Sequence, residues 1–254
     1  MPIRIALGRR VFAPSWLMTA ATLSLLPVFI ALGAWQWGRA EYKQRLAAEF
    51  SAGSAEQQPL GTRPTATLSR FAAVEVRGQW DGARQFLLDN RTRDGRAGYD
   101  VLTPLRLDDG RWLIVDRGWV PGSGFRERLP EVTFALGDGA AVVTLRGRLD
   151  DWPAAGLESG RAAPATTGAW PRVTAYPHVA DIARALATDA ESAPRVEARL
   201  LLLDDAEPNG YLRAWRPFVK GPEQNWSYAL QWWSFAVLLV VLYVVLNTKK
   251  RELS

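Results

Sequence analysis

Residues 11–38, VFAPSWLMTAATLSLLPVFIALGAWQWG, and residues 224–248, QNWSYALQWWSFAVLLVVLYVVLNT, decide the fold of this chain. Neither stretch contains an Asp, Glu, Lys or Arg residue. Each is longer than the roughly 20 residues that a helix needs to cross about 30 Å of hydrocarbon. We therefore expect a membrane protein in which two helices flank one folded domain.

The net charge of +5 is concentrated at the two ends of the chain. Residues 1–10 and 249–254 together hold six basic residues and one acidic residue, whereas residues 39–223 hold 25 of each kind. Short loops rich in Lys and Arg stay on the cytoplasmic side of a membrane. Both termini are therefore predicted to be cytoplasmic and the domain periplasmic. Because the domain is neutral overall, we expect no nucleic-acid partner.

The first apolar stretch could also be read as a cleaved signal peptide. The apolar part of a signal peptide covers only about 7–15 residues, so this stretch is too long. The sequence Arg9-Arg10-Val11-Phe12 resembles part of a twin-arginine export signal. Basic residues before any inward-anchored helix give such matches, so we interpret the stretch as an uncleaved anchor.

The pattern predicts five segments along the chain. They are a cytoplasmic tail (1–10), a transmembrane helix (11–38), a periplasmic β-rich domain (39–223), a second transmembrane helix (224–248) and a cytoplasmic tail (249–254). The first helix is expected to start near Trp16, and residues 40–50 contain few helix breakers and could continue it into water. Residues 51–67 are rich in Gly, Pro, Ser, Thr and Gln, which predicts a linker or loop.

The domain shows strand signals one after another. They cover residues 71–80, 84–91, 99–107, 111–120, 141–149 and 199–205. Asp108-Asp109-Gly110 predicts a hairpin turn, and apolar residues at helical spacing predict one helix from about Pro177 to Thr188. Residues 150–171 predict a loop. The expected fold class is an α+β membrane protein, with a mainly antiparallel β domain built as an open barrel or a sandwich.

The residue inventory argues against several kinds of chemistry. The chain has no cysteine, which excludes disulfides, thiol redox centres and Cys-based metal sites. Its single histidine, His178, precedes the predicted helix and is interpreted as a surface or capping residue. No serine lies in a nucleophile-elbow context, and no glycine-rich phosphate loop follows a strand. We therefore expect no catalytic residues, no metal site and no enzyme.

Two polar-aromatic segments lie inside predicted strands: residues 88–91, with Gly98-Tyr99 after them, and residues 115–121. Asp and Asn are poor strand residues, so their presence needs a reason. Asp and Arg on neighbouring strands could form a cross-strand ion pair, with Gly118 allowing close approach. Alternatively, these residues could form a surface that binds a partner.

The start of the second helix combines aromatic and polar residues. Trp226 and Trp233 share one face, and Gln231 lies about 9 Å along the helix from Asn225. A glutamine at that depth needs a hydrogen-bonding partner within the bundle, and Gln36 at the matching end of the first helix is the one we expect. The segment is either helix–helix packing with an aromatic belt or a groove for a ligand or partner.

These motifs together resemble the surfeit locus protein 1 family and its bacterial relatives. Residues 32–39, LGAWQWGR, followed by Lys43, are similar to the family signature at the end of the first helix. Residues 89–91, 98–105 and 115–121 are similar to its central blocks. Residues 228–232, YALQW, resemble its second-helix block, and the matches run in family order from about residue 32 to 236.

The resemblance implies an assembly factor for haem–copper cytochrome c oxidase in the bacterial inner membrane. Such a factor assists haem a insertion or stabilisation in the catalytic subunit. The implied partners are that subunit, a haem a synthase and the lipid bilayer, and haem a is a transient cargo instead of a required cofactor. The alternative is a membrane-anchored scaffold or sensor without a haem role.

Relatives in this family often carry a haem-linked histidine three residues before the tyrosine of the second-helix block. Asn225 stands at that position here, so the resemblance gives no expectation of direct haem ligation by a histidine. The candidates for a partner or haem site are Trp35, Gln36, Arg39, Asp89, Asn90, Arg91, Asp116, Arg117, Gly118, Trp119, Asn225, Tyr228, Gln231 and Trp232.

Overall fold

The computed structural model of the 254-residue chain describes residues 5–7, 10–53, 57–125, 128–132, 142–155, 160–187, 193–215 and 221–250. The chain divides into two compact units. Met1–Ala48 and Pro217–Ser254 form one unit, and Glu49–Arg216 form the other, which we call the head.

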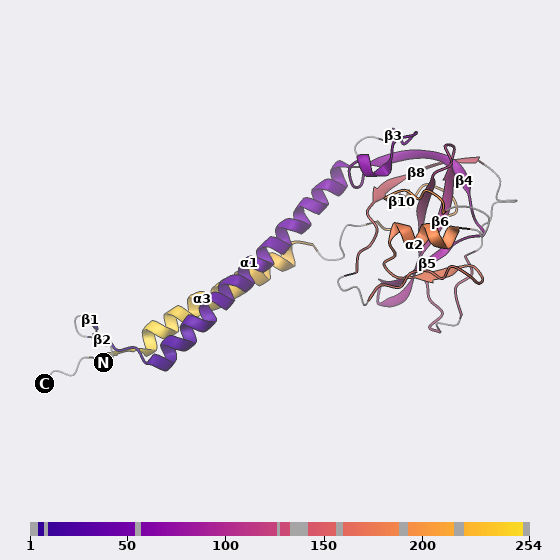
Figure 1. Cartoon of the computed structure of the whole chain (residues 1–254). Helices are drawn as coiled ribbons and strands as arrows, with labels where there is room; N and C mark the ends of the chain where they lie inside the picture. Colours follow the sequence, from indigo (N-terminus) through magenta and orange to yellow (C-terminus); the bar gives the residue numbers. More distant parts are fainter. Residues whose placement is uncertain are drawn as a thin grey trace. The chain divides into compact units, whose positions relative to one another are not determined.

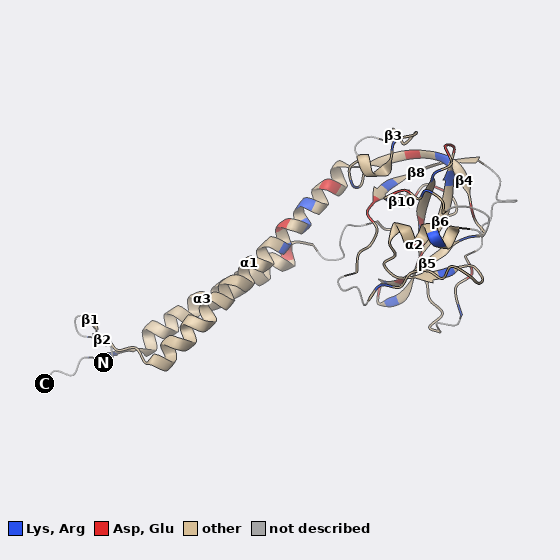
Figure 2. Cartoon of the chain, in the orientation of Figure 1, with Lys and Arg blue, Asp and Glu red and all other residues tan. Residues whose placement is uncertain are grey.

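Two long helices make up most of the first unit. They are α1 (Trp16–Ala52) and α3 (Glu223–Leu246), and Figure 1 shows them side by side. Both are long and apolar enough to span a membrane, with mean hydropathies of 2.0 and 2.2 over their most apolar windows. Figure 2 shows that the paired length of the helices is almost free of charged residues. Helix α1 begins at Trp16 as expected, and it continues past residue 50 because residues 40–50 contain no Gly or Pro.

The two helices pack antiparallel through small residues. Strand β2 (Arg10–Phe12), which precedes α1, pairs antiparallel with β11 (Thr248–Lys250), which follows α3. The buried positions of the contact include Gly33 of α1 and Ala236 of α3. Small side chains let helix backbones approach closely in lipid, where van der Waals packing drives association.

Asn247 closes the helix pair at the end that carries the chain termini. Strand β1 (Ile5–Leu7) joins β2 and β11 in a three-stranded sheet there. The buried Asn247 accepts a hydrogen bond from the backbone N–H of Ser15 at 2.8 Å and donates one to the carbonyl of Tyr243 at 2.7 Å. One side chain thus satisfies groups at the start of α1 and the end of α3. Helix α3 therefore ends at Leu246, two residues before the predicted boundary.

Among the described residues of the head, eight strands form one strongly curved sheet. They are β3 (Gln58–Pro59), β4 (Ala73–Trp80), β5 (Phe86–Arg93), β6 (Arg96–Leu107), β7 (Trp112–Pro121), β8 (Val142–Asp150), β9 (Arg172–Thr174) and β10 (Leu200–Leu203). Their order is β3-β4-β8-β10-β7-β6-β5-β9, and a further pairing of β4 with β6 closes five of them into a ring. The head is therefore barrel-like, with β3, β5 and β9 attached outside the ring.

The strand predictions are confirmed for β4 to β8 and β10, with boundaries within three residues. Asp108-Asp109-Gly110 forms the predicted turn between β6 and β7, and Gly110 has the positive φ of 84° that favours glycine. The predicted helix is α2 (Val179–Leu186), and the exposed His178 occupies its N-cap position.

The prediction of a linker or loop over residues 51–67 is confirmed for most of the described residues there, but not for all of them. This segment contains β3 and a short 3₁₀ helix, η1 (Thr65–Thr67). It also inserts Leu60 into the barrel interior, where the side chain is only 1% exposed. The segment is polar in composition because only this one apolar side chain reaches the core. Strand β9 was also not predicted, because three residues are too short for a periodic pattern.

Three apolar clusters hold the head together. The largest fills the ring with side chains from β4, β6, β7, β8 and β10. The second lies between α2 and β5–β7, and includes Phe86 and Ile182. The third covers the opposite face of β5–β7 and includes Leu87 and Val101. Strands β5–β7 are thus buried on both faces, and their polar side chains have to be paired there.

Candidate functional site

A hydrogen bond joins the two long helices at the start of α3. The side-chain amide of Asn225 donates to Oε1 of Gln36 at 2.6 Å. The expected pairing of Gln36 with Gln231 is therefore wrong: Gln231 is exposed and faces away from α1. Its position differs from that of Asn225 by six residues, which separates the two side chains by about a third of a turn around the helix.

The oxygen of the same amide, Oδ1 of Asn225, is buried without a hydrogen-bond partner among the described residues. An unpaired buried carbonyl oxygen is costly, and more so in a membrane environment. Asn225 stands at the position where, by the resemblance described above, relatives often carry a histidine. The helix pair thus has one free acceptor at the candidate site.

Aromatic packing surrounds this polar contact. Trp233 packs against Trp37 with ring centroids 5.7 Å apart. A Cβ atom built on Gly33 would lie 2.2 Å from Nε1 of Trp233, so the indole occupies the space above the glycine. Trp232 packs against Phe29 at 5.9 Å. The indoles of Trp232 and Trp233 therefore serve the contact with α1.

The remaining candidates on the helices point outward. Trp35 is 59% exposed and Tyr228 is 44% exposed, and Gln231 and Arg39 are exposed as well. The predicted site thus divides into an inner part that joins the helices and an outer part that is free to meet lipid or another protein.

In the head, the segment Asp89-Asn90-Arg91 forms a β-bulge. The register between β5 and β6 shifts between Leu88 and Arg91, and Asn90 has a φ of 61°. The backbone N–H of Asn90 bonds to Oδ1 of Asp89 at 2.7 Å. Asn and Asp tolerate this left-handed conformation better than other residues. The bulge therefore explains two residue types that are poor in regular strands.

The expected cross-strand ion pair is present, but its acid is Asp100. Nε of Arg91 on β5 lies 2.9 Å from Oδ2 of Asp100 on β6. Trp119 on β7 lies opposite Asp100, and its indole N–H donates to the carbonyl of Arg91 at 3.3 Å. The two polar-aromatic segments predicted from the sequence therefore meet across β5, β6 and β7.

Asp116 is the least solvated acid of this cluster. It is 3% exposed, and its Oδ1 accepts a hydrogen bond from the backbone N–H of Gly118 at 3.0 Å. Burial raises the pKa of Asp116 well above the usual range, and the nearby carboxylate of Asp100 raises it further. Burial also raises the pKa of Asp100, against the opposing charge of Arg91. The carboxyl groups of Asp100 and Asp116 therefore retain a proton to a higher pH than isolated Asp side chains do.

Arg117 points to the opposite face of the sheet. It is 2% exposed, and its guanidinium donates to Oε1 of Gln85 at 2.9 Å and to the carbonyl of Asn209 at 2.7 Å. Its charge also lies 4.9 Å from the ring centre of Tyr211. Burial lowers the pKa of Arg117. Arg117 therefore ties β7 to the segment around residue 209 and is not available to a ligand.

Gly118 allows the backbone at Leu212 to approach β7 closely. Its φ is 105°, and a Cβ atom there would lie 2.8 Å from the carbonyl oxygen of Leu212. The backbones of Trp119 and Leu212 bond to each other at 2.9 and 3.2 Å. Glycine at position 118 thus lets the chain after β10 pair with β7, as the expectation of close approach indicated.

Sequence reasoning missed several residues of these networks. Gln85 and Thr103 both contact Arg117, and neither stands out in the sequence: Gln85 directly precedes β5, and Thr103 has apolar neighbours in β6. Asp100 lies within the matched block 98–105 but was not singled out. An arginine directly after an acidic residue inside a strand, as in Asp116-Arg117, is the sequence signal that could have indicated a buried polar network.

The side chains at the start of α3 do not form a conventional haem-iron site. Asn225 is engaged with Gln36, and tyrosine is the only common axial-ligand type there, at Tyr228. Among the described residues, no three His, Asp or Glu side chains are grouped so that they could hold a metal ion.

Comparison with known proteins gives the family. A sequence model of the SURF1 family matches residues 23–237, which include most of both long helices and the whole head. A SURF1-like protein of Dictyostelium discoideum is 29% identical over 108 residues, which are 37% of this chain and 40% of the relative. The match with that relative thus spans two fifths of its length. The family match covers more than half of the chain, and the protein therefore belongs to the SURF1 family.

Proposed function

We propose that this protein is a membrane-bound assembly factor for haem–copper cytochrome c oxidase, and that it assists insertion or stabilisation of haem a in the catalytic subunit. The observation that carries the proposal is the family match, which runs without a break through α1, the head and α3. The SURF1 family is known for cytochrome oxidase assembly and is not a family of catalytic enzymes. The proposed activity is therefore binding and positioning.

Haem a is the cargo in this proposal, and its iron is ligated by the catalytic subunit or by a haem a synthase. The amide oxygen of Asn225 does not replace a histidine as an iron ligand in this proposal, because an amide oxygen is not one of the common axial ligands of haem iron. The outward-facing Trp35, Tyr228 and Gln231 supply the contact surface. This division leaves the helix pair intact while a partner is bound.

The proposed location is the bacterial inner membrane. The basic residues of both tails favour cytoplasmic termini and a periplasmic head. The apolar lengths of α1 and α3 support two membrane spans. A cysteine introduced into the head should then react with a membrane-impermeant maleimide in intact spheroplasts, whereas one in either tail should react only after lysis.

A deletion strain tests the function. We expect its membranes to lose haem a absorbance and cytochrome c oxidase activity, and the wild-type gene to restore both. Membranes that keep their full haem a absorbance and oxidase activity would rule the assembly role out and leave the scaffold or sensor alternative.

Haem ligation is tested separately. The full chain is purified from cells that overproduce haem a, and its visible spectrum is recorded. We expect no stoichiometric haem on the wild-type protein. A bound haem whose spectrum is lost in Tyr228→Phe would instead assign the iron to this protein.

A further inference from the structure

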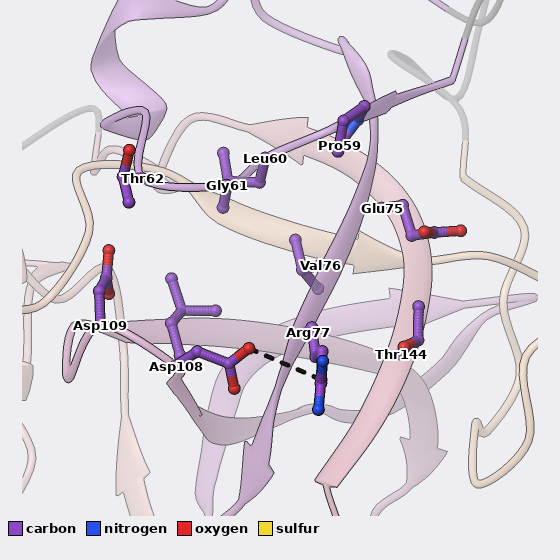
Figure 3. Close-up of a pocket in the computed structure, with 11 residues that line it drawn as sticks. Pro59, Leu60, Gly61, Thr62, Glu75, Val76, Arg77, Asp108, Asp109 and Thr144 are labelled. Carbon is purple, nitrogen blue, oxygen red and sulfur yellow. Dashed lines mark ion pairs between the residues drawn. The ribbon is translucent and has the colours of Figure 1, made fainter.

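A cavity of about 360 Å³ opens in the wall of the head barrel, away from the motif residues described above. Figure 3 shows Val76 between the turn that carries Asp108 and the strand that carries Thr144. The cavity is lined by Pro59, Leu60, Gly61, Thr62, Glu75, Val76, Arg77, Leu107, Asp108, Asp109 and Thr144.

The cavity follows from a gap in the strand pairing of β4. Strand β3 pairs with β4 only at Val74 and Glu75, and β6 pairs with it only from Gly78 onward. On this edge, none of the described strands pairs with β4 at Val76 and Arg77. The gap gives access to the apolar side chains of the barrel interior, which form the floor: Leu60, Val76 and Leu107.

One wall of the cavity is held by a buried arginine. The guanidinium of Arg111 donates to the carbonyls of Gly61 at 2.8 Å and Arg63 at 3.1 Å. It is fixed in turn by Asp109 at 2.6 Å and by the buried Glu197 at 2.7 Å. The cavity is therefore formed before any ligand binds, which lowers the entropy cost of binding.

The rim carries three carboxylates, each paired with an arginine. The lining contains three carboxylates and one guanidinium, and only Asp109 is committed to the close contact with Arg111. Asp108 lies 3.6 Å from Arg77, and Glu75 lies 3.4 Å from Arg146. All four of these side chains are at least 41% exposed, and such ion pairs contribute little to stability. Both carboxylates can therefore exchange their partners for an incoming cation.

We propose that this cavity binds an alkyl cation: an ammonium or guanidinium group on a short aliphatic stem, as in a lysine or arginine side chain. The stem covers the apolar floor of Leu60, Val76 and Leu107, and the cationic group reaches Asp108 and Glu75. Long basic side chains bury their stems on apolar surfaces and keep the charge near polar groups in the same way. This site is independent of the proposed function in oxidase assembly.

The test uses the full chain in nanodiscs of zwitterionic phosphatidylcholine. Binding of n-butylamine and of the peptide Gly-Lys-Gly is measured by the amide chemical shifts of Val76 and Arg77. n-Butanol and butyrate serve as matched neutral and anionic probes. We expect saturable binding of both cations, at least about tenfold weaker binding of the other probes, and weakening by added salt. If Gly-Lys-Gly binds more tightly than n-butylamine, the natural ligand is a basic side chain of a protein. If n-butylamine binds more tightly, the natural ligand is a free amine.

Four variants locate the site. Asp108→Asn and Glu75→Gln should each weaken cation binding by about two- to fivefold. Asp205→Asn removes an exposed acid elsewhere on the head and should change nothing. Thr144→Lys places an ammonium group at the rim itself and should abolish binding. Amide hydrogen exchange of β4 and β8 confirms that each variant is folded.

The proposal is overturned if butanol or butyrate binds as tightly as butylamine. It is equally overturned if Asp205→Asn weakens binding as much as Asp108→Asn does, or if folded Thr144→Lys retains binding.

Discussion

The side-chain amide of Asn225 lies 2.6 Å from Oε1 of Gln36 and forms a polar contact between α1 and α3. The two residues lie at the same end of the helix pair although they are far apart in the sequence. Hydrogen bonds between membrane helices contribute about 0.6 kcal/mol on average and up to about 1.7 kcal/mol in measured cases. This contact therefore fixes the register of the helices more than it supplies their total stability.

A double-mutant cycle should detect this coupling. We expect Gln36→Leu and Asn225→Leu each to lower the free energy of helix-pair unfolding in detergent by about 1 kcal/mol. The double variant should cost no more than the larger single effect, because both changes remove the same bond. Strict additivity of the two single effects would show that the residues do not interact.

Two glycines on α1 provide a matched steric comparison. Gly33→Ala should lower the free energy of helix-pair unfolding by about 1–3 kcal/mol, because its Cβ would meet the indole of Trp233 at 2.2 Å. Gly38→Ala has no atom within 4 Å of the new Cβ and should be neutral or stabilising by about 0.5–1 kcal/mol. Equal effects of the two changes, measured by unfolding in detergent, would contradict the packing described here.

The raised pKa of Asp116 predicts a pH dependence of head stability. Since the folded head holds the proton more tightly than the unfolded chain does, its stabilisation is complete below the ordinary carboxyl pKa of about 4. It is lost as the pH rises through the raised pKa of the folded state. Asp116→Asn keeps the acceptor for the N–H of Gly118 and removes the ionisation.

We therefore expect Asp116→Asn to flatten the decline in head stability between about pH 4 and neutral pH, and to stabilise the head at neutral pH. Amide hydrogen exchange of β7 measures both effects. Asp205→Asn, an exposed acid, is the control. A steeper pH dependence in Asp116→Asn than in the wild-type protein would contradict the assignment.

Gln231 faces outward, so a substitution there tests contact with a partner without changing the packing of α1 against α3. We expect Gln231→Leu to leave the stability of the helix pair unchanged, because the side chain is exposed. It should nevertheless lower the oxidase activity of complemented membranes severalfold. Leu238→Ala alters an exposed residue two turns along the same face and should keep full activity. Unchanged activity in Gln231→Leu would show that oxidase assembly does not depend on this face of α3.

The elements that the sequence predicted well are those with a local signal. Alternation in residues 73–80, the turn at Gly110 and the uncharged runs of α1 and α3 each depend on neighbouring residues alone. The closure of the barrel depends on the pairing of β4 with β6, a contact between distant residues that no local pattern encodes. The two-residue strand β3 is too short for any periodic signal.

The candidate site was predicted in part for the same reason. The motif residues were found, and the structure brings Arg91 on β5 and Trp119 on β7 together across β6. The partner of Gln36 was predicted wrongly because Asn225 and Gln231 lie about a third of a turn apart around the helix, and the sequence does not say which face meets α1. The buried pair of Asp100 and Asp116 required the register of β6 and β7.

The most direct test of the assembly role is the ratio of haem a to catalytic subunit in cytochrome c oxidase purified from a strain that lacks this protein. The account predicts a ratio well below that of the wild-type enzyme, restored by the wild-type gene. An oxidase with its full complement of haem a in the deletion strain would contradict it.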